Sequence, residues 1–119
     1  MTARVSIDNV VGEPLANDAT LADIVQRLVE ELRPERIYLF GSKARGDGDS
    51  DSDYDLMVIL PHTAEPGYRL AKRAHAVIWD VGTAADILVW SREAFDGRLH
   101  LRASLPATIV REGRLVYAA

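Results

Sequence analysis

The sequence predicts an α/β domain of the α+β kind, in which a small mixed sheet is flanked by helices. Short apolar runs of strand length alternate with amphipathic segments of helical spacing, and clusters of turn-forming residues separate them. The chain has 119 residues, of which 48% are hydrophobic, and this is enough for one core. The expected order of elements is helix, strand, strand, helix, strand, helix, strand.

The first half of the chain predicts one helix and two strands. Asp18 or Thr20 can cap a helix that ends at Pro34. Branched and aromatic residues at 37–40 and 56–60 give these two runs the composition of strands. The apolar positions of the helix follow helical spacing: Leu21, Ile24, Val25, Leu28 and Leu32.

The second half predicts the remaining elements. Pro61 and the Pro66-Gly67 pair form a turn after the second strand. Pro106 at a helix start and Gly113 at its end mark the limits of the last helix. The predicted elements are a helix at 68–79, a strand at 85–90, a short capped turn beginning at Ser91, a helix at 105–112 and an edge strand at 114–117.

Composition narrows the classes of function. The chain contains no cysteine, which excludes disulfides and zinc–thiolate sites and makes a cytoplasmic location the expectation. The formal net charge of −4 argues against direct nucleic-acid binding, which normally uses a basic face. We expect no membrane association, because no segment resembles a signal peptide or a membrane span. Residues 1–17 are expected to be an N-terminal extension without a clear motif, and residues 18–119 to form the domain.

The segment between the first two strands carries the candidate chemistry. Gly41-Ser42 forms a turn after the first strand, an irregular polar loop follows, and the second strand opens on Asp53 and Asp55. Because side chains alternate along a strand, the two carboxylates project from one face and repel each other unless a cation lies between them. Mg²⁺ is commonly held by one or two carboxylates together with substrate phosphates. The segment therefore indicates an enzyme that handles a nucleoside triphosphate.

The acidic segment also allows two other interpretations. A run of carboxylates is most often a solvated loop, and this interpretation suits Asp47, Asp49 and Asp51. A calcium-binding EF-hand loop needs Gly at its sixth position and Glu at its twelfth. No such register fits, because a loop starting at Asp47 has Ser52 and Val58 at these positions. Starting at Asp49, the positions hold Tyr54 and Leu60.

Asp86 is a third candidate. It lies in the apolar run that forms the third strand, where an unpaired buried carboxylate would be energetically unfavourable. Either an Arg side chain pairs with it, or it joins Asp53 and Asp55 around the metal ions. A third carboxylate would permit a second ion, or serve as the base that accepts a proton from an attacking hydroxyl.

These residues resemble a known family. Gly41-Ser42, ten intervening residues and then Asp53-Tyr54-Asp55 resemble the Gly-Ser-x10-Asp-x-Asp signature of the minimal nucleotidyltransferases, small members of the DNA polymerase β superfamily. The fuller strings Gly-Ser-x-Ala-Arg-Gly and Ser-Asp-x-Asp-Leu are present at 41–46 and 52–56. The resemblance covers roughly residues 20 to 117 and implies the polymerase β-like nucleotidyltransferase fold.

The resemblance also implies an activity. In this family the Gly-Ser turn binds a triphosphate, here through Gly41 and Ser42, and AMP passes from ATP to a hydroxyl with release of pyrophosphate. The carboxylates hold two Mg²⁺ ions, a role that would fall to Asp53, Asp55 and Asp86. The candidate cations that steer the triphosphate are Lys43, at a variable position of the motif, and Arg45, at a fixed one.

The short chain resembles the antitoxin half, of the MntA type, of pairs whose partner is a helical HEPN ribonuclease. The resemblance implies transfer of AMP to a Tyr of the toxin and a hetero-oligomer with it. The first alternative is a catalytically silent module that neutralises its partner by steric binding. A further alternative is nucleotidyl transfer to a small molecule, which usually needs a second domain.

The remaining aromatic and His residues give weaker signals. Tyr54 should point away from the carboxylates and pack, and Trp79 is expected to be a core or interface aromatic. His62, His75 and His100 have no spacing that suggests a ligand set. The candidate residues for docking a partner are Trp90, Phe95 and Tyr117.

Overall fold

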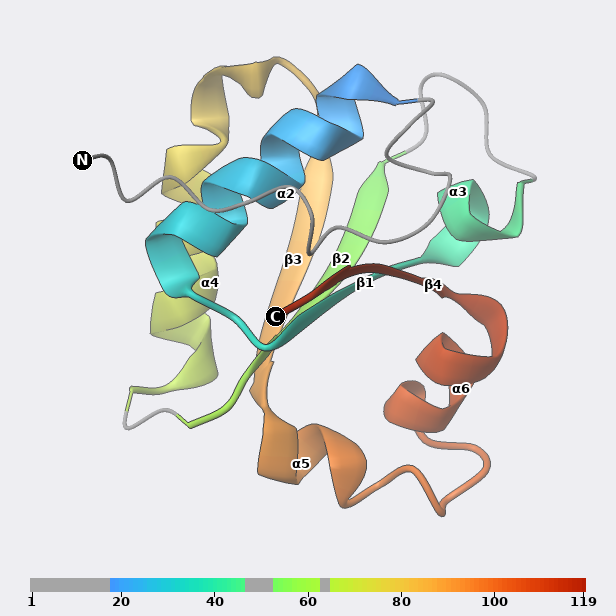
Figure 1. Ribbon diagram of the computed structural model, residues 1–119. Helices are drawn as coiled ribbons and strands as arrows, with labels where there is room; N and C mark the ends of the chain where they lie inside the picture. Colours follow the sequence, from blue (N-terminus) through green and yellow to red (C-terminus); the bar gives the residue numbers. More distant parts are fainter. Residues whose placement is uncertain (1–17, 47–52, 63–64) are drawn as a thin grey trace.

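The computed structural model describes residues 18–46, 53–62 and 65–119. They form a four-stranded sheet with the order β3-β2-β1-β4 (Figure 1). Strand β1 is antiparallel to both β2 and β4, whereas β2 and β3 are parallel. The mixed sheet confirms the predicted class. The strands are β1 (Arg36–Phe40), β2 (Tyr54–Leu60), β3 (Ala85–Ser91) and β4 (Arg114–Ala118).

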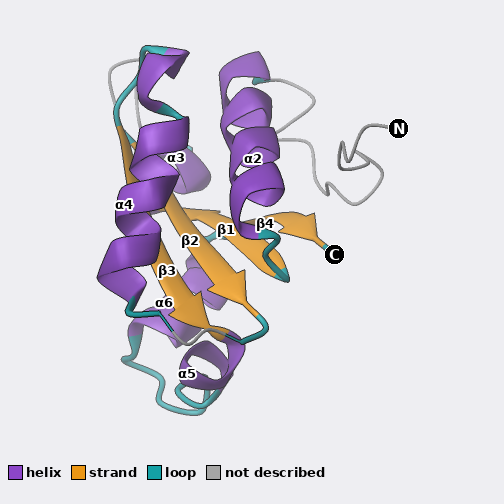
Figure 2. Ribbon diagram, turned by 90° about the vertical axis from the view of Figure 1, so that its left-hand side faces the viewer, coloured by secondary structure: helices purple, strands orange, loops and turns teal. Residues whose placement is uncertain are grey.

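Helices lie on both faces of the sheet (Figure 2). Helices α2 (Ala19–Leu32) and α4 (Gly67–Val77) cover one face. Helices α5 (Arg92–Asp96) and α6 (Leu105–Glu112) lie against the other. The short helix α3 (Gly41–Arg45) follows β1, and the 3-10 turn η2 (Trp79–Val81) follows α4. Among the described residues, no helix is long and apolar enough to cross a membrane.

Helix α2 follows its local sequence signals. The side chain of Asp18 accepts a hydrogen bond from the backbone N–H of Leu21, so Asp18 is the N-cap. The helix ends at Leu32, and Arg33 caps it in a left-handed conformation just before Pro34. The predicted apolar positions are all buried, together with Val29.

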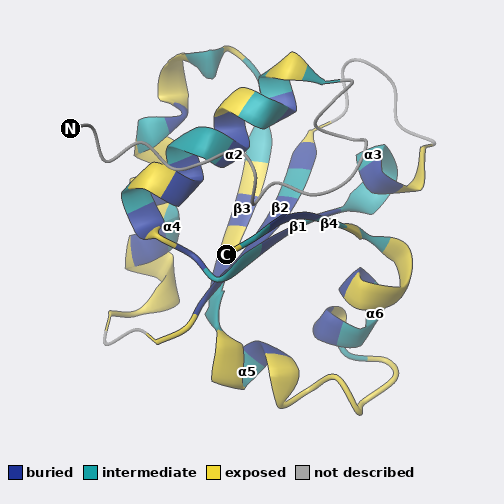
Figure 3. Ribbon diagram, in the orientation of Figure 1, coloured by how far each residue is buried: buried dark blue, intermediate teal, exposed yellow. Residues whose placement is uncertain are grey.

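The two faces of the sheet have separate cores (Figure 3). Alternate residues of β2 point to opposite faces, because side chains alternate along a strand. Leu56 and Val58 belong to the large core beneath α2 and α4. Met57 and Ile59 belong to a smaller core with Phe95 of α5 and others of the second face. The remaining members of the smaller core are Ile109, with Tyr38, Phe40 and Trp90 packed against it.

Three predictions differ from the structure. The segment after β1 is helical from Gly41 to Arg45, rather than a turn followed by irregular loop, and Gly46 ends it in a left-handed conformation. The predicted capped turn is the short helix α5, whose N-cap Ser91 accepts a hydrogen bond from Ala94 N. The third difference is that the helix expected at 68–79 ends at Val77 and is followed by η2. Asp47, Asp49, Asp51 and the expected extension 1–17 lie outside the described residues.

The predicted docking aromatics were largely wrong. Phe95 is 0% exposed and Tyr117 is 4% exposed, because each packs into one of the two cores. Neither can therefore contribute to an exposed docking surface. Trp79 is 86% exposed, so it is not a core residue. Trp90 is half-buried at the margin of the smaller core.

Candidate active site

The structure brings the three candidate carboxylates to one end of the sheet. Asp53 immediately precedes β2, Asp55 is the second residue of β2, and Asp86 is the second residue of β3. Asp55 and Asp86 are partners in the parallel register of β2 and β3. Their side chains therefore leave the sheet on the same face and from adjacent strands. This register favours the interpretation in which Asp86 joins the other two carboxylates.

Asp86 differs from its expected environment in one respect. It is exposed, not buried, because β3 is an edge strand and none of the described helices packs over Asp86. The desolvation cost that the apolar sequence context suggested therefore does not arise at this position. Asp55 is half-buried, and Asp53 is exposed at the mouth of β2.

The neighbouring carboxylates affect the pKa of Asp55. Burial raises the pKa of the Asp55 carboxyl above its ordinary value, and the negative charges of Asp86 and Asp53 raise it further. The positive charge of Arg45 acts in the opposite direction. A divalent cation would relieve this repulsion, so the electrostatics of the site suit a cation.

The donor set fits Mg²⁺ in chemistry. Carboxylate oxygens are its preferred protein ligands, and two of the three carboxylates are direct neighbours across the sheet. Within the described ranges, no group of three or more His, Cys, Asp or Glu side chains is already arranged to hold a metal ion. A pair of carboxylates together with substrate phosphates is nevertheless a common way to hold Mg²⁺.

Gly41 holds the candidate phosphate turn against the carboxylates. Its φ of +76° lies in the left-handed region, which residues other than Gly rarely adopt. A Cβ atom at this position would overlap Oδ2 of Asp55. The preceding residue, Phe40, is the partner of Asp55 in the antiparallel register of β1 and β2. Gly is thus needed here on two grounds, and Ser42 is brought next to the acidic end of β2.

The two candidate cations have different surroundings. Arg45 lies in the last turn of α3 and is exposed, and its charge lowers the pKa of Asp55. The Nζ of Lys43 lies 4.5 Å from the centre of the Tyr54 ring, in a cation–π contact. Arg45 therefore acts on the carboxylate site directly, whereas Lys43 contacts the residue between the two aspartates.

Tyr54 is a packing residue, as the alternation of the strand predicts. Its side chain is only 6% exposed and belongs to the large core on the face opposite Asp55. Its hydroxyl donates a hydrogen bond to Oδ2 of Asp18, at 2.7 Å. Burial and this bond raise the pKa of Tyr54 to about 12, so the hydroxyl stays protonated.

Sequence reasoning missed two contacts that support this site. Arg114 of β4 donates a hydrogen bond from Nε to the carbonyl oxygen of Ala44, at 3.1 Å, and so ties α3 to the opposite edge of the sheet. Asp18 was recognised as a helix cap but not as the partner of Tyr54. Neither contact has a local sequence signal, because the partners lie far apart in the chain.

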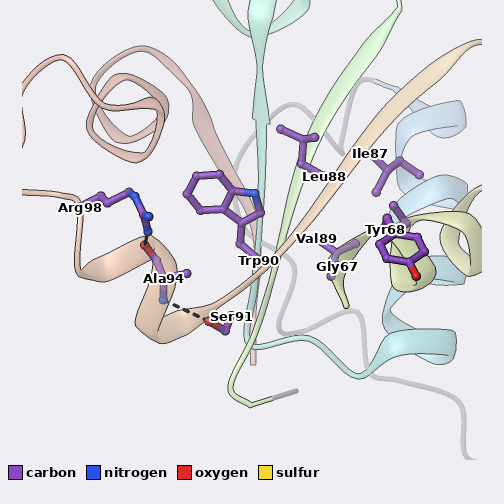
Figure 4. Close-up of a pocket in the computed structure, with 10 residues that line it drawn as sticks. Gly67, Tyr68, Ile87, Leu88, Val89, Trp90, Ser91, Ala94 and Arg98 are labelled. Carbon is purple, nitrogen blue, oxygen red and sulfur yellow. Dashed lines mark hydrogen bonds between the residues drawn. The ribbon is translucent and has the colours of Figure 1, made fainter. Parts of the chain in front are cut away.

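A groove of about 730 Å³ follows the outer edge of β3 beyond Asp86. Figure 4 shows Leu88 and Trp90 on one side of the strand and Ile87 and Tyr68 on the other. Tyr68 is 71% exposed, and Leu88 is 37% exposed. The guanidinium of Arg98 lies over the Trp90 ring, 5.6 Å from its centre. The groove is mainly apolar, unlike the acidic end of the sheet.

Comparison with known families assigns the chain to a class. Residues 19–115 match the nucleotidyltransferase domain family. The chain therefore belongs to this family, as the motif at 41–56 predicts. No curated protein matches the chain.

Solved structures agree on the fold. A candidate nucleotidyltransferase from Sulfolobus solfataricus is 20% identical, with a TM-score of 0.54 over 82% of this chain and 76% of that one. A mutant MntA–HpeT toxin–antitoxin structure is 20% identical, with a TM-score of 0.52 over 83% and 72% of the two chains. A toxin–antitoxin structure with AMP-PNP is also 20% identical, with a TM-score of 0.50 over 82% and 73%. At this identity the likeness establishes the nucleotidyltransferase fold.

Proposed function

We propose that this chain is a Mg²⁺-dependent nucleotidyltransferase that moves AMP from ATP to a hydroxyl of a partner protein. The acceptor would be a Tyr of a HEPN-type toxin, and the chain would act as the antitoxin in a hetero-oligomer. The observation that carries the chemistry is the register of Asp55 with Asp86, with Asp53 at the mouth of the same strand.

Each residue of the site has a proposed role. Ser42 would bind the triphosphate through its hydroxyl and backbone N–H, beside the carboxylates that Gly41 approaches. Asp53, Asp55 and Asp86 would hold the two Mg²⁺ ions, which stabilise negative charge on the attacking and leaving oxygens when bound. Arg45 would offset part of the charge that develops on the phosphoryl group.

The transfer itself is a simple exchange of bonds. The acceptor oxygen forms a bond to the α-phosphorus as the bond from that phosphorus to pyrophosphate breaks. The acceptor proton has to leave, and Asp86 is a suitable base because it is the exposed member of the neighbouring carboxylate pair. Asp86 would therefore serve either as this base or as a ligand of the second ion.

The size of the site supports a protein acceptor. Asp53 and Asp86 are exposed at one end of a sheet face, and the described part of this small domain provides one wall but little to enclose a second substrate. A partner would supply the opposite wall. The fold likeness to toxin–antitoxin structures agrees with such a partner. The family resemblance supports a HEPN-type toxin as this partner.

A catalytically silent antitoxin is the second candidate. It would use the same partner surface without transferring a nucleotide. In that case the chain would neutralise its partner by binding alone.

Calorimetry of ATP binding separates the two candidates at the level of the metal site. We expect ATP to bind in the presence of Mg²⁺ and not in the presence of EDTA, because three carboxylates without a cation repel the triphosphate. Equal affinity under both conditions would contradict the metal site.

Mass spectrometry of the partner then tests the transfer. The partner encoded beside this chain, incubated with the chain, Mg²⁺ and ATP, should gain the mass of one or more AMP units on Tyr. An unmodified partner that is nevertheless inhibited in a tight complex would favour the silent antitoxin.

A further inference from the structure

Tyr54 lies between the two aspartates of the motif but on the other face of the sheet. Its ring is buried beneath α2, and its hydroxyl donates to Oδ2 of Asp18 at 2.7 Å. The other oxygen of Asp18 accepts the N–H of Leu21 at 3.0 Å and caps α2. One carboxylate thus joins the first turn of α2 to the residue that separates Asp53 from Asp55.

Two further contacts meet at the same residue. The backbone N–H of Tyr54 donates to the carbonyl oxygen of Ala84, at 3.1 Å, just before β3 begins. The ammonium of Lys43, from α3, lies 4.5 Å from the centre of the Tyr54 ring. Tyr54 is therefore held by α2, by α3 and by the chain leading to Asp86. These are the elements whose relative positions set the geometry of the candidate active site.

Fixing Tyr54 also fixes its neighbours. Successive residues of a strand are joined by planar peptide units, and the pairing of β2 with β1 and β3 limits rotation between them, so a displacement of Tyr54 would also move Asp53 and Asp55. The two carboxylates are themselves half-buried or exposed. The buried anchor on the opposite face can thus hold in place the charged pair that solvent and mutual repulsion would otherwise spread apart.

We propose that Tyr54 is a positioning residue that holds Asp53 and Asp55 in the arrangement needed for the cation, through its hydrogen bond to Asp18. The inference rests on the proposed function, since it concerns the same cation and nucleotide. Tyr54 does not touch the substrate; it acts through the backbone between its two neighbours.

The test compares the Mg²⁺ requirement of two single variants, their double variant and a control with that of the wild type. Tyr54→Phe keeps the ring and its contact with Lys43 but removes the hydroxyl. Asp18→Ser keeps a good helix cap but is too short to reach Tyr54. The measured quantity is the Mg²⁺ concentration that gives half-maximal ATP binding in calorimetry. Each single variant should raise this concentration by about tenfold, the lower end of the effect seen for residues that orient the ligands of a metal site.

The double variant sharpens the test. If both residues act through one hydrogen bond, Tyr54→Phe combined with Asp18→Ser should require no more Mg²⁺ than either single variant. Tyr117→Phe is the matched control, because it removes the hydroxyl of another buried tyrosine, in β4 at the far edge of the sheet. This control should leave the Mg²⁺ requirement unchanged.

The outcomes are distinguishable. A lower melting temperature in Tyr54→Phe with an unchanged Mg²⁺ requirement would show a purely structural role and overturn the inference. Additive effects in the double variant would overturn the shared hydrogen bond as its cause. A wild-type chain that shows no Mg²⁺-dependent ATP binding would instead overturn the proposed function, and this inference with it.

Discussion

The two faces of the sheet are built from the same strands but are covered to different extents. Helices α2 and α4 span one face, and the residues of β2 that point toward them are almost fully buried. On the other face, α5 and α6 cover Met57 and Ile59, whereas at the opposite end, within the described residues, Asp55 is half-buried and Asp86 is exposed. Figure 3 shows exposed residues on the upper part of β3 and buried ones deeper in the sheet.

The two faces should therefore contribute differently to stability and to the proposed activity. The fully covered face contains most of the buried apolar side chains and should supply most of the hydrophobic stabilisation. The half-covered face combines a small apolar core with a charged end, where the proposed nucleotide and cation would bind. Substitutions on the two faces should therefore affect different measurements.

The largest expected effect is on nucleotide transfer. Asp53→Asn or Asp55→Asn should lower the rate by about 100-fold or more, because each removes a charge that stabilises bound cations. The folded state should survive, since neither carboxylate is fully buried. Asp80→Asn, at an exposed carboxylate in η2, is the control and should leave transfer unchanged. Rates of AMP transfer and thermal melts provide the measurements, and collapsed melts in both site variants would mean a structural role for the pair.

A large effect on stability is expected in the smaller core. Phe95→Ala should lower the free energy of unfolding by about 3–5 kcal/mol, because the ring is 0% exposed and packs against Met57 and Ile59. Leu88→Ala, on the open part of the same face, should cost no more than about 1 kcal/mol because Leu88 is 37% exposed. Urea denaturation measures both. Equal losses would show that the second face is covered more uniformly than the structure indicates.

A smaller effect is expected where α3 meets the carboxylates. Gly41→Ala and Gly46→Ala both place a side chain at a positive φ, at a cost of about 1–2 kcal/mol each. Only Gly41→Ala adds an overlap with Asp55, because a Cβ at Gly46 would meet no atom of the described residues within 4 Å. Gly41→Ala should therefore lower stability more than Gly46→Ala does, and it should also lower the rate of nucleotide transfer. Gly46→Ala should lower stability alone. Similar transfer rates in the two variants would argue against the close approach.

The free energy of unfolding should depend on pH through Asp55. The pKa of Asp55 lies above its ordinary value of 3.8, so the native state holds this proton more tightly than the unfolded state does. The contribution of Asp55 to the free energy of unfolding must then fall as pH rises from the ordinary to the raised pKa. Asp55→Asn should remove this fall, and the wild-type minus variant difference in urea denaturation across the acidic range isolates it. A difference that grows more favourable to the wild type with rising pH would contradict the direction of the shift.

The smallest effect is expected at Trp79. Trp79→Ser should change the free energy of unfolding by less than about 0.5 kcal/mol, since the side chain is 86% exposed. Trp90→Ser should cost about 1–3 kcal/mol, because Trp90 packs against the smaller core and lies under Arg98. Thermal denaturation compares the pair. A large loss at Trp79 would mean that it packs against more of the chain than the described residues.

Local physics explains what the sequence could predict. The cap at Asp18, the apolar spacing of α2 and the stop at Pro34 are all encoded within one helix length. The shared face of Asp53 and Asp55 follows from the alternation of a strand, and the family motif follows from the residues of the loop. The motif also predicted the family that residues 19–115 match.

Tertiary packing explains what it could not. Helix α3 is too short for helical spacing to be visible in the sequence. The burial of Phe95 depends on which strand residues it meets, and the exposure of Asp86 depends on β3 being an edge strand. The contact between Tyr54 and Asp18 joins residues far apart in the chain, so no local sequence pattern predicts it.

The parallel pairing of β2 with β3 also sets the order in which the site can be assembled. Parallel neighbours need a crossover, here through α4, so Asp55 and Asp86 meet only after this long loop has closed. Such non-local contacts generally form slowly during folding. In a nascent or partly folded chain, Asp86 would thus not yet lie beside Asp53 and Asp55. Cation binding would then favour the completed topology over earlier states and stabilise the chain by mass action once the crossover is in place.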